Sequence, residues 1–218
     1  MIRAYRTRGF TLVELLIVIG IILIAASVLF TGLGGGGDGL KLSSAQRIAA
    51  SIAQGARGQA ILKDTKTRLI IYSENNDSGD VEKKLRFFGI IHEDPENEDQ
   101  WFAGTQGTYL PDGIYFDPQL SGANAWPQSR MNIEFPRRSA QSDGSGPEYY
   151  YYEFNPNGTM ATSFQNSWLV VRAGTLRPNT SGDLEVDFTN ESKENIRAAL
   201  IFRRVGTTTL VTDPEEIN

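Results

Sequence analysis

The sequence predicts an α+β protein, in which one long N-terminal helix continues into an amphipathic helix packed on antiparallel β-sheets. Three observations lead to this fold class. The 218-residue chain begins with a basic segment and an unbroken apolar run, continues with an alanine-rich stripe at helical spacing, and ends in short β-rich runs between turn residues. We therefore divide it into a leader (1–9), an apolar helix (10–31), a glycine-rich joint (32–42) and a β domain (43–218).

The composition narrows the chemistry that the chain can perform. Apolar residues make up 40% and charged residues 22%, which is ordinary for a folded protein. There is no cysteine and a single histidine, His92, so disulfides, thiolate zinc sites and cysteine nucleophiles are excluded. No nucleophile elbow or cofactor loop is found. We predict a protein that is not an enzyme and holds neither a cofactor nor a metal.

The first thirty residues have the pattern of a membrane signal. Three arginines lie in the leader, and every residue from Leu15 to Phe30 is apolar or small. Counted from Phe10, the run would form a helix of about 31 Å, close to the ~30 Å hydrocarbon core of a bilayer. The positive-inside rule keeps the leader cytoplasmic and exports the rest. A cleaved secretory peptide, with Ala25–Ser27 as a weak cleavage site, is the alternative.

Glu14 fits neither a secretory peptide nor a plain anchor. A carboxylate in an apolar helix costs roughly 2.5–3.5 kcal/mol at the bilayer centre and less near its surface. Such a residue is usually paired or functional. We therefore expect Glu14 to have a partner or a function within the membrane.

The residues around Glu14 resemble a known signal. The segment reads Arg8-Gly9-Phe10-Thr11-Leu12-Val13-Glu14-Leu15-Leu16. It resembles the signal of type IV pilins and type II secretion pseudopilins. The resemblance implies that a prepilin peptidase cuts after Gly9 and methylates Phe10. It further implies that Glu14 pairs with the terminal amine and sets the register of the subunit in a filament.

A glycine-rich joint follows the apolar run. Residues 32–39 contain six glycines, and each glycine inside a helix costs about 1 kcal/mol relative to alanine. We expect this segment to be non-helical or easily melted. The resemblance offers a use, because pilin helices can unwind locally in a filament; a flexible linker is the alternative.

An amphipathic helix is predicted after the joint, with Ser43 or Ser44 as its N-cap. Its apolar residues recur at helical spacing and predict a stripe packed against a sheet. The stripe comprises Ala45, Ile48, Ala49, Ile52, Ala53, Ala56 and Ala60. The opposite face is expected to carry Gln46, Arg47, Ser51, Gln54 and Arg57. The Ala56-Arg57 pair is similar to one in H-type minor pseudopilins.

Short β-rich runs follow Lys63. The predicted strands are 68–72, 85–92, 113–116, 131–135, 149–154, 167–171, 184–188, 199–205 and 207–211. Asn155–Gly158 predicts a turn, and Gly206 predicts a hairpin between the last two strands. Leu110–Phe116 and Phe154–Gly158 resemble a strand entry and a turn of the H-type minor pseudopilin, general secretion pathway protein H. The glycine-rich joint and the polar insert Arg137–Glu148 depart from that pattern.

Two polar or aromatic clusters leave alternatives open. Residues 92–99 contain five carboxylates in eight positions. This run favours a solvated loop over a calcium site, because it lacks a loop-making glycine. Tyr149–Tyr152 should place tyrosines alternately on the two faces of a strand. Two would pack in the core and two would meet solvent or a partner; a stacking platform for sugars or bases is the alternative.

A basic cluster at Arg197, Arg203 and Arg204 raises a nucleic-acid alternative. The formal charge opposes it, because loss of the three leader arginines changes the net charge from −5 to −8. Affinity for nucleic acid depends largely on neutralising phosphates with basic side chains. We therefore do not expect a nucleic-acid partner.

The resemblance implies a minor pseudopilin or pilin subunit of a type II secretion pseudopilus or a type IV pilus-like filament. Its partners would be the prepilin peptidase, other pilins or pseudopilins, the assembly platform and the inner membrane. The chain would cross the inner membrane once, with a cytoplasmic N-terminus and a periplasmic domain. The alternatives are a minor pilin for DNA uptake or adhesion, and a signal-anchored periplasmic binding domain that does not polymerise.

Overall fold

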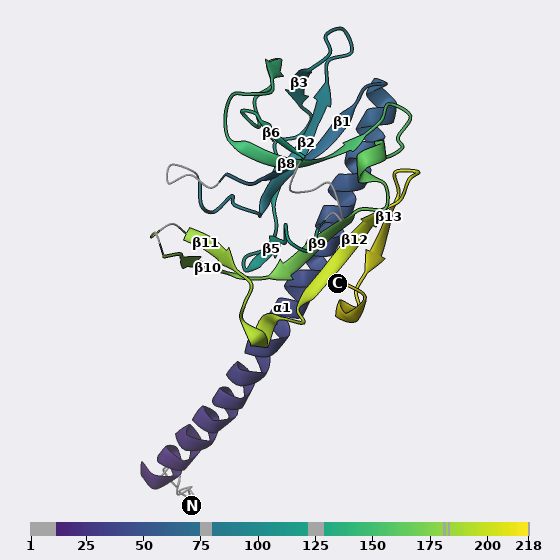
Figure 1. Ribbon diagram of the computed structural model, residues 1–218. Helices are drawn as coiled ribbons and strands as arrows, with labels where there is room; N and C mark the ends of the chain where they lie inside the picture. Colours follow the sequence, from purple (N-terminus) through teal and green to yellow (C-terminus); the bar gives the residue numbers. More distant parts are fainter. Residues whose placement is uncertain (1–11, 75–79, 122–128, 181, 183, 218) are drawn as a thin grey trace, which may run out of the picture. The chain divides into compact units, whose positions relative to one another are not determined.

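The computed structural model describes residues 12–74, 80–121, 129–180, 182 and 184–217, and for residues 24–36 it describes the backbone alone (Figure 1). The predicted leader and cleavage site lie outside the described residues. Contacts within the chain define two units, Met1–Gly37 and Asp38–Asn218. Each unit is described by itself below.

The first element is a single helix, α1 (Leu12–Lys63). Residues 32–42 are helical, which corrects the expected non-helical joint, while the ease with which this segment melts stays a prediction. Glycine lowers the stability of a helix, yet it can still adopt helical backbone angles. Ser43 and Ser44 lie inside the helix and do not cap it. The described residues include no helix whose length and hydropathy would suffice to cross a bilayer.

The larger sheet has seven strands in the second unit, all paired antiparallel. Its path runs β6-β8-β1-β2-β3-β7, with β4 paired to β2. Its strands are β1 (Thr67–Tyr72), β2 (Phe87–Glu93), β3 (Gln100–Ala103), β4 (Thr108–Tyr109), β6 (Arg130–Asn132), β7 (Gln141–Ser142) and β8 (Glu148–Phe154).

A second antiparallel sheet has four strands in the order β13-β12-β9-β5, and β10 pairs with β11 in a separate hairpin. These strands are β5 (Ile114–Phe116), β9 (Trp168–Ala173), β10 (Thr175–Pro178), β11 (Leu184–Asp187), β12 (Arg197–Phe202) and β13 (Thr208–Val211). Among the described residues, short 3-10 helices lie before β9 (Thr162–Phe164), before β12 (Glu191–Lys193) and after β13 (Pro214–Glu216).

The α+β fold class and all nine predicted strands are confirmed, with shifted ends. The largest shifts are in β12, which both begins and ends before its predicted bounds, and in β6. The latter strand ends at Asn132, because the backbone N–H of Glu134 donates to the side chain of Gln141 (3.0 Å) and leaves the ladder. Four strands were not predicted: β3, β4, β7 and β10. Two of these have only two residues, too few for a pattern, and β10 ends in Pro178, which is typical of an edge.

The main core lies between the alanine stripe of α1 and the two sheets. All five alanines of the stripe are fully buried. They meet one face of each sheet, including Tyr152 and Phe154 of β8 and Leu200 and Phe202 of β12. Because alanine is small, the backbone of α1 approaches both sheets closely, so the predicted packing of the stripe is confirmed.

Further apolar clusters cover the other faces of the sheets. Trp101, Phe135 and Tyr149 belong to a cluster on the larger sheet. Ile217, near the C-terminus, joins Val170 on the smaller sheet and is 1% exposed. The domain therefore buries both sides of its sheets.

Candidate assembly surfaces

The N-terminal stretch of α1 carries the predicted assembly residue. Gly9 and Phe10 lie outside the described residues, whereas Glu14 lies in the first turn of α1 and is exposed. A carboxylate in the first turn interacts favourably with the positive end of the helix dipole. Glu14 is also the only charged residue between Phe10 and Gly37. The structure therefore places one acidic group at the start of a helix that is otherwise apolar for several turns.

The apolar side chains around Glu14 are exposed on every side of the helix. Their exposed fractions range from 46% at Val18 to 79% at Leu12. Consecutive residues of an α-helix point about 100° apart, so the run from residue 12 to 23 surrounds the helix with apolar surface. Soluble monomers rarely expose contiguous apolar surface on this scale. This stretch has the surface of a segment that is covered by lipid or by other protein.

Two glutamines of α1 that were predicted on the open face of the helix are buried or half-buried against the β domain. Gln46 was expected on the open face, but it is 3% exposed, and its Nε2 donates to the carbonyls of Ala199 and Val211, both at 2.9 Å. Gln54 is half-buried and donates to Thr208 Oγ1 (3.1 Å). Both side chains fasten α1 to the β12–β13 hairpin. Arg47 and Ser51 are exposed as expected.

Arg57 was also predicted on the open face of the helix but is half-buried, and it connects three features of the sequence. Its Nε donates to the carbonyl of Gly158 (3.1 Å), the last residue of the predicted turn 155–158. That turn is confirmed by the bond from Gly158 N to Asn155 O (2.8 Å). A Cβ at Gly206 would overlap the same Gly158 carbonyl. The Ala56-Arg57 pair, the turn and the hairpin glycine therefore meet at one place, although Arg57 and Gly158 are 101 residues apart in the sequence.

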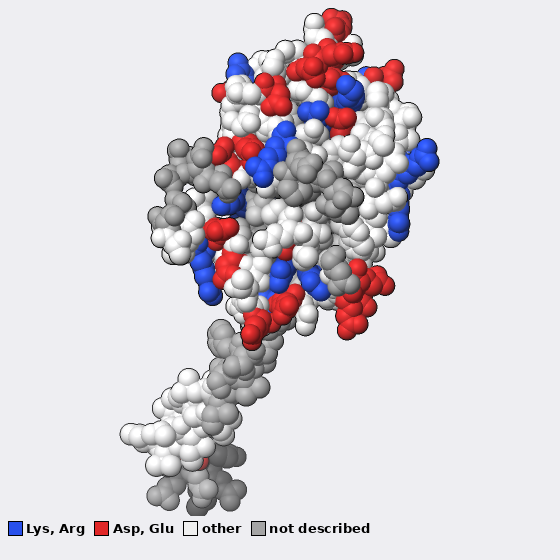
Figure 2. All heavy atoms as spheres, in the orientation of Figure 1, with Lys and Arg blue, Asp and Glu red and all other residues white. Residues whose placement is uncertain are grey.

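The acidic run forms the loop between β2 and β3, at the top of Figure 1, where Figure 2 shows acidic side chains. Glu93 is buried, pairs with Lys66 (3.4 Å) and accepts from the backbone N–H of Asp99 (3.1 Å). Hydrogen bonds from Asn97 and from the backbone of Glu96 lower the pKa of Asp94. Within the described part of the chain, no group of three or more His, Cys, Asp or Glu side chains is arranged to hold a metal ion.

The tyrosine run divides differently from a simple alternation. Tyr149 and Tyr152, which lie on opposite faces of β8, are both buried, while Tyr150 and Tyr151 are half-buried. The guanidinium of Arg68 lies between the rings of Tyr151 and Trp101, 4.1 and 4.0 Å from their centres. Arg68 therefore covers one face of the Tyr151 ring, so that face is not open for a sugar or a base to stack on.

The predicted basic cluster is not assembled. Arg197 begins β12 and donates from Nε and from a terminal nitrogen to the carbonyl of Pro214 (3.1 and 2.8 Å). Arg203 and Arg204 follow the other end of β12, six residues away. At about 3.3 Å per residue, this separates them from Arg197 by roughly 20 Å. Arg203 and Arg204 alone share one surface.

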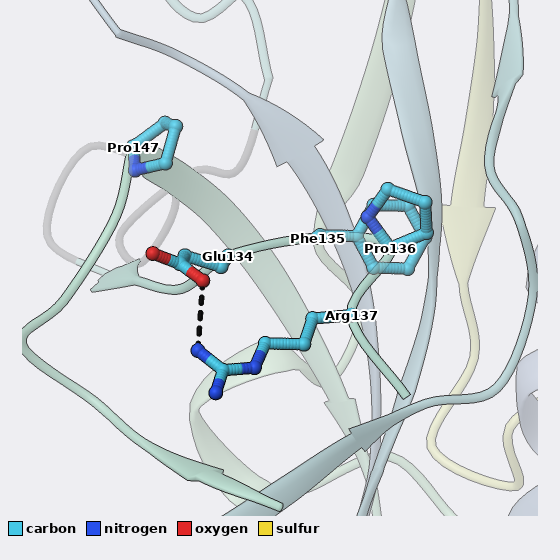
Figure 3. A pocket seen from close by; sticks show the side chains of 5 residues that line it. All are labelled: Glu134, Phe135, Pro136, Arg137 and Pro147. Carbon is cyan, nitrogen blue, oxygen red and sulfur yellow. Dashed lines mark hydrogen bonds and ion pairs between the residues drawn. The ribbon is translucent and has the colours of Figure 1, made fainter. Parts of the chain in front are cut away.

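An open hollow of about 410 Å³ lies beside the polar insert (Figure 3). It is lined by Glu134, Phe135, Pro136, Arg137 and Pro147. Glu134 and Arg137 form an ion pair at 2.8 Å, and each side chain is 54% exposed. Exposed pairs of this kind contribute little energy. The one carboxylate among these lining residues is already paired, and none of them carries a hydroxyl, thiol or amine.

The single histidine packs against an aromatic ring. His92 stacks on Phe102, with ring centres 5.5 Å apart and an angle of 26° between the planes. Its Nδ1 lies 3.3 Å from the carbonyl of Glu93. Burial lowers the pKa of His92 below its ordinary value of 6.5. Together these contacts give His92 a structural place in the β2–β3 hairpin.

Sequence reasoning missed the surface where α1 meets the β12–β13 hairpin. Ile61 is 51% exposed and Val205 is 58% exposed, although both are large apolar residues. Ile61 lies off the alanine stripe of α1, and Val205 lies at the end of a predicted strand, so neither position by itself indicates that the other is near. Only the packing of α1 against the hairpin brings them to one surface.

The comparisons with known proteins bear on the N-terminal stretch and on the fold. Residues 5–30 match the prokaryotic N-terminal methylation motif. No curated protein matches the sequence. A similar solved structure is the minor pseudopilin EpsH from the type 2 secretion system of Vibrio cholerae, with a TM-score of 0.41 and 10% identity over 78% of this chain and 96% of that chain. The chain therefore carries the methylation motif of prepilin-type proteins, which confirms the resemblance found at its N-terminus.

Proposed function

We propose that this chain is a minor pseudopilin or pilin subunit that a prepilin peptidase processes and that joins a periplasmic filament. The peptidase cuts between Gly9 and Phe10 and methylates Phe10. The helix over residues 10–31 anchors the chain in the inner membrane before assembly, and the β domain lies in the periplasm. The similar secretion-system protein favours a pseudopilus of a type II secretion system, which transports proteins.

The observation that carries this proposal is Glu14, alone among exposed apolar side chains in a segment that matches the methylation motif. Cleavage after Gly9 creates an amine at Phe10, one helical turn before Glu14. The carboxylate and the amine of a neighbouring subunit are then opposite charges in an apolar environment. Loss of one partner would leave the other buried and unpaired, at a cost of about 3–5 kcal/mol. The pair therefore selects the register at which a subunit enters.

Intact mass spectrometry of the protein from native membranes tests the processing step. We expect a chain that starts at Phe10 and carries one additional methyl group. A Gly9→Val variant should retain the leader, while the matched variant Gly20→Val, whose added Cβ meets no neighbour within 4 Å, should be processed normally. A mature chain starting at Met1 or after Ala25–Ser27 would contradict the proposal.

The role of Glu14 is tested by filament entry. We expect Glu14→Ala and Glu14→Gln to lower the amount of the chain in purified filaments at least about tenfold, because each loses several kcal/mol of pairing. Ile17→Ala, a neighbouring exposed position, is the control. If the Glu14 variants co-purify with filaments at the normal ratio, the role proposed for Glu14 in filament entry is wrong.

A further inference from the structure

The tip of the β12–β13 hairpin is held in one conformation. Within it, Arg203 N donates to Thr207 O and Gly206 N donates to Arg203 O, both at 2.8 Å. Gly206 has a φ of +80°, which glycine adopts without strain. It is buried against the carbonyl of Gly158. The hairpin loop, residues 204–206, is therefore fixed by hydrogen bonds and packs against the domain through Gly206.

The same turn connects this tip to the end of α1. Arg57 holds the Gly158 carbonyl (3.1 Å), and Met160 N donates to Arg204 O (3.1 Å). A Cβ at Gly158 would come within 2.6 Å of Ile61 Cδ1, and the side chain of Arg57 lies close to both Gly158 and Gly206. Ile61 and the hairpin tip therefore contact the same turn and form one continuous surface. We call this surface the tip patch; it comprises Arg57, Ile61, Arg203, Arg204 and Val205.

The tip patch combines exposed apolar groups with unneutralised positive charge. Val205 is 58% exposed and Ile61 is 51% exposed. Arg203 and Arg204 are exposed, and none of the three arginines forms an ion pair with any residue that the structure describes. The whole chain has a formal charge of −5. Figure 2 shows basic side chains on the side of the domain where Figure 1 shows the β12–β13 hairpin.

We propose that the tip patch binds the periplasmic domain of a different subunit in the same filament, at an apolar contact rimmed by carboxylates; this rests on the function proposed above. Arginine is enriched at protein–protein interfaces, and the exposed Val205 and Ile61 add apolar area that a protein partner can bury. A positive patch on an acidic chain selects a negative surface. Because the tip is already ordered, binding loses little conformational entropy.

Nucleic acid fits the tip patch less well than protein does. Its apolar centre, Val205 and Ile61, offers nothing to a phosphate backbone. Arg197 does not add to the patch, because it lies about 20 Å away at the other end of β12. Its guanidinium donates to the carbonyl of Pro214. A protein surface uses both the charge and the apolar area of the patch.

Site-specific photo-crosslinking in cells that make the filament tests the proposal on the full chain. The photoreactive residue p-benzoylphenylalanine replaces Val205, or as a control Leu184, which is 42% exposed on β11. We expect Val205 to crosslink to another filament subunit, identified by mass spectrometry, and Leu184 not to. The double variant Arg203→Glu/Arg204→Glu should lower the yield at least about tenfold, because it places like charges together. The matched variant Arg137→Glu/Arg138→Glu, a second exposed arginine pair, should not.

Several outcomes would overturn the proposal. One is a chain that starts at Phe10 and enters filaments but gives no crosslink from Val205 to another subunit. A second is a crosslinked product made of two copies of this chain. A third is binding of duplex DNA, seen as a change in its electrophoretic mobility, that the double variant Arg203→Glu/Arg204→Glu abolishes. A chain that starts at Met1 and is missing from filaments would instead show that the proposed function fails. Circular dichroism of the double variant confirms that it folds.

Discussion

Two stretches of the one helix α1 have opposite surfaces. Residues 12–23 are large and apolar and are exposed, while Ala45, Ala49, Ala53, Ala56 and Ala60 are small and fully buried. Both stretches have the same backbone conformation. The difference teaches that side-chain size and pattern, rather than secondary structure, decide what each stretch contacts.

The two stretches of α1 differ in how much of the helix circumference is apolar. The alanine stretch has one apolar stripe, and both sheets of its own domain cover that stripe. The first stretch is apolar on every side, so no single neighbour within its own chain would cover it. Burial of this stretch would therefore require lipid or other protein.

The largest effect on stability is expected from enlarging a buried alanine. Ala53→Leu inserts three carbons between α1 and the sheets and should lower the free energy of unfolding of the domain by about 3 kcal/mol. Ser51→Leu, on the exposed side of the same helix, should change it by less than about 0.5 kcal/mol. Urea unfolding of the full chain in detergent measures both. Equal effects of the two variants would show that the alanine stripe is not packed as described.

An intermediate effect is expected at Gln46, the polar residue buried beside the stripe. Gln46→Leu keeps the volume but removes the donors to Ala199 O and Val211 O. It should lower the free energy of unfolding by about 1–3 kcal/mol, because two buried carbonyls lose a partner. The control is Arg47→Leu, which is exposed. Hydrogen exchange of β13 should quicken in the Gln46 variant alone; unchanged exchange would argue against this link.

The smallest effect concerns the one titratable imidazole of the domain. Burial lowers the folded pKa of His92 below 6.5, so the unfolded chain binds more protons in the interval between the two pKa values. Stability should therefore be complete above about pH 6.5 and decline as the pH falls through the folded pKa. Because there is one histidine, its NMR titration is unambiguous. A titration midpoint at or above that of the urea-unfolded chain would contradict this prediction.

Local patterns predicted much of the fold. The alanine stripe, the turn 155–158, the hairpin at Gly206 and nine strands all follow from spacing, glycine and proline positions, and β-branched or aromatic runs. The strands β4 and β7 were not predicted, because two residues are too few to show a periodic pattern. The helical backbone of residues 32–42 was not predicted either. Helix propensity is a small energy, which the helical segments on either side can override.

The candidate surfaces divide in the same way. Glu14 and its apolar surroundings are visible in the sequence, because one carboxylate in a long apolar run contradicts its context. The tip patch is not visible there, since Ile61, Arg57 and Val205 have no local feature that joins them. Arg197 shows the converse, because it is near Arg203 in the chain but at the opposite end of a strand.

The sequence by itself determined where α1 has an apolar surface and which short segments form strands, because these depend on neighbours within a few residues. Only the tertiary structure decided that Gln46 is buried and that Arg57 meets the Gly158 turn. It also decided that the β12–β13 tip is packed down beside Ile61. The hydrogen bonds of Gln46 and Arg57 join residues 101 to 165 positions apart, and such pairs are selected by the closing of the whole core rather than by any local preference.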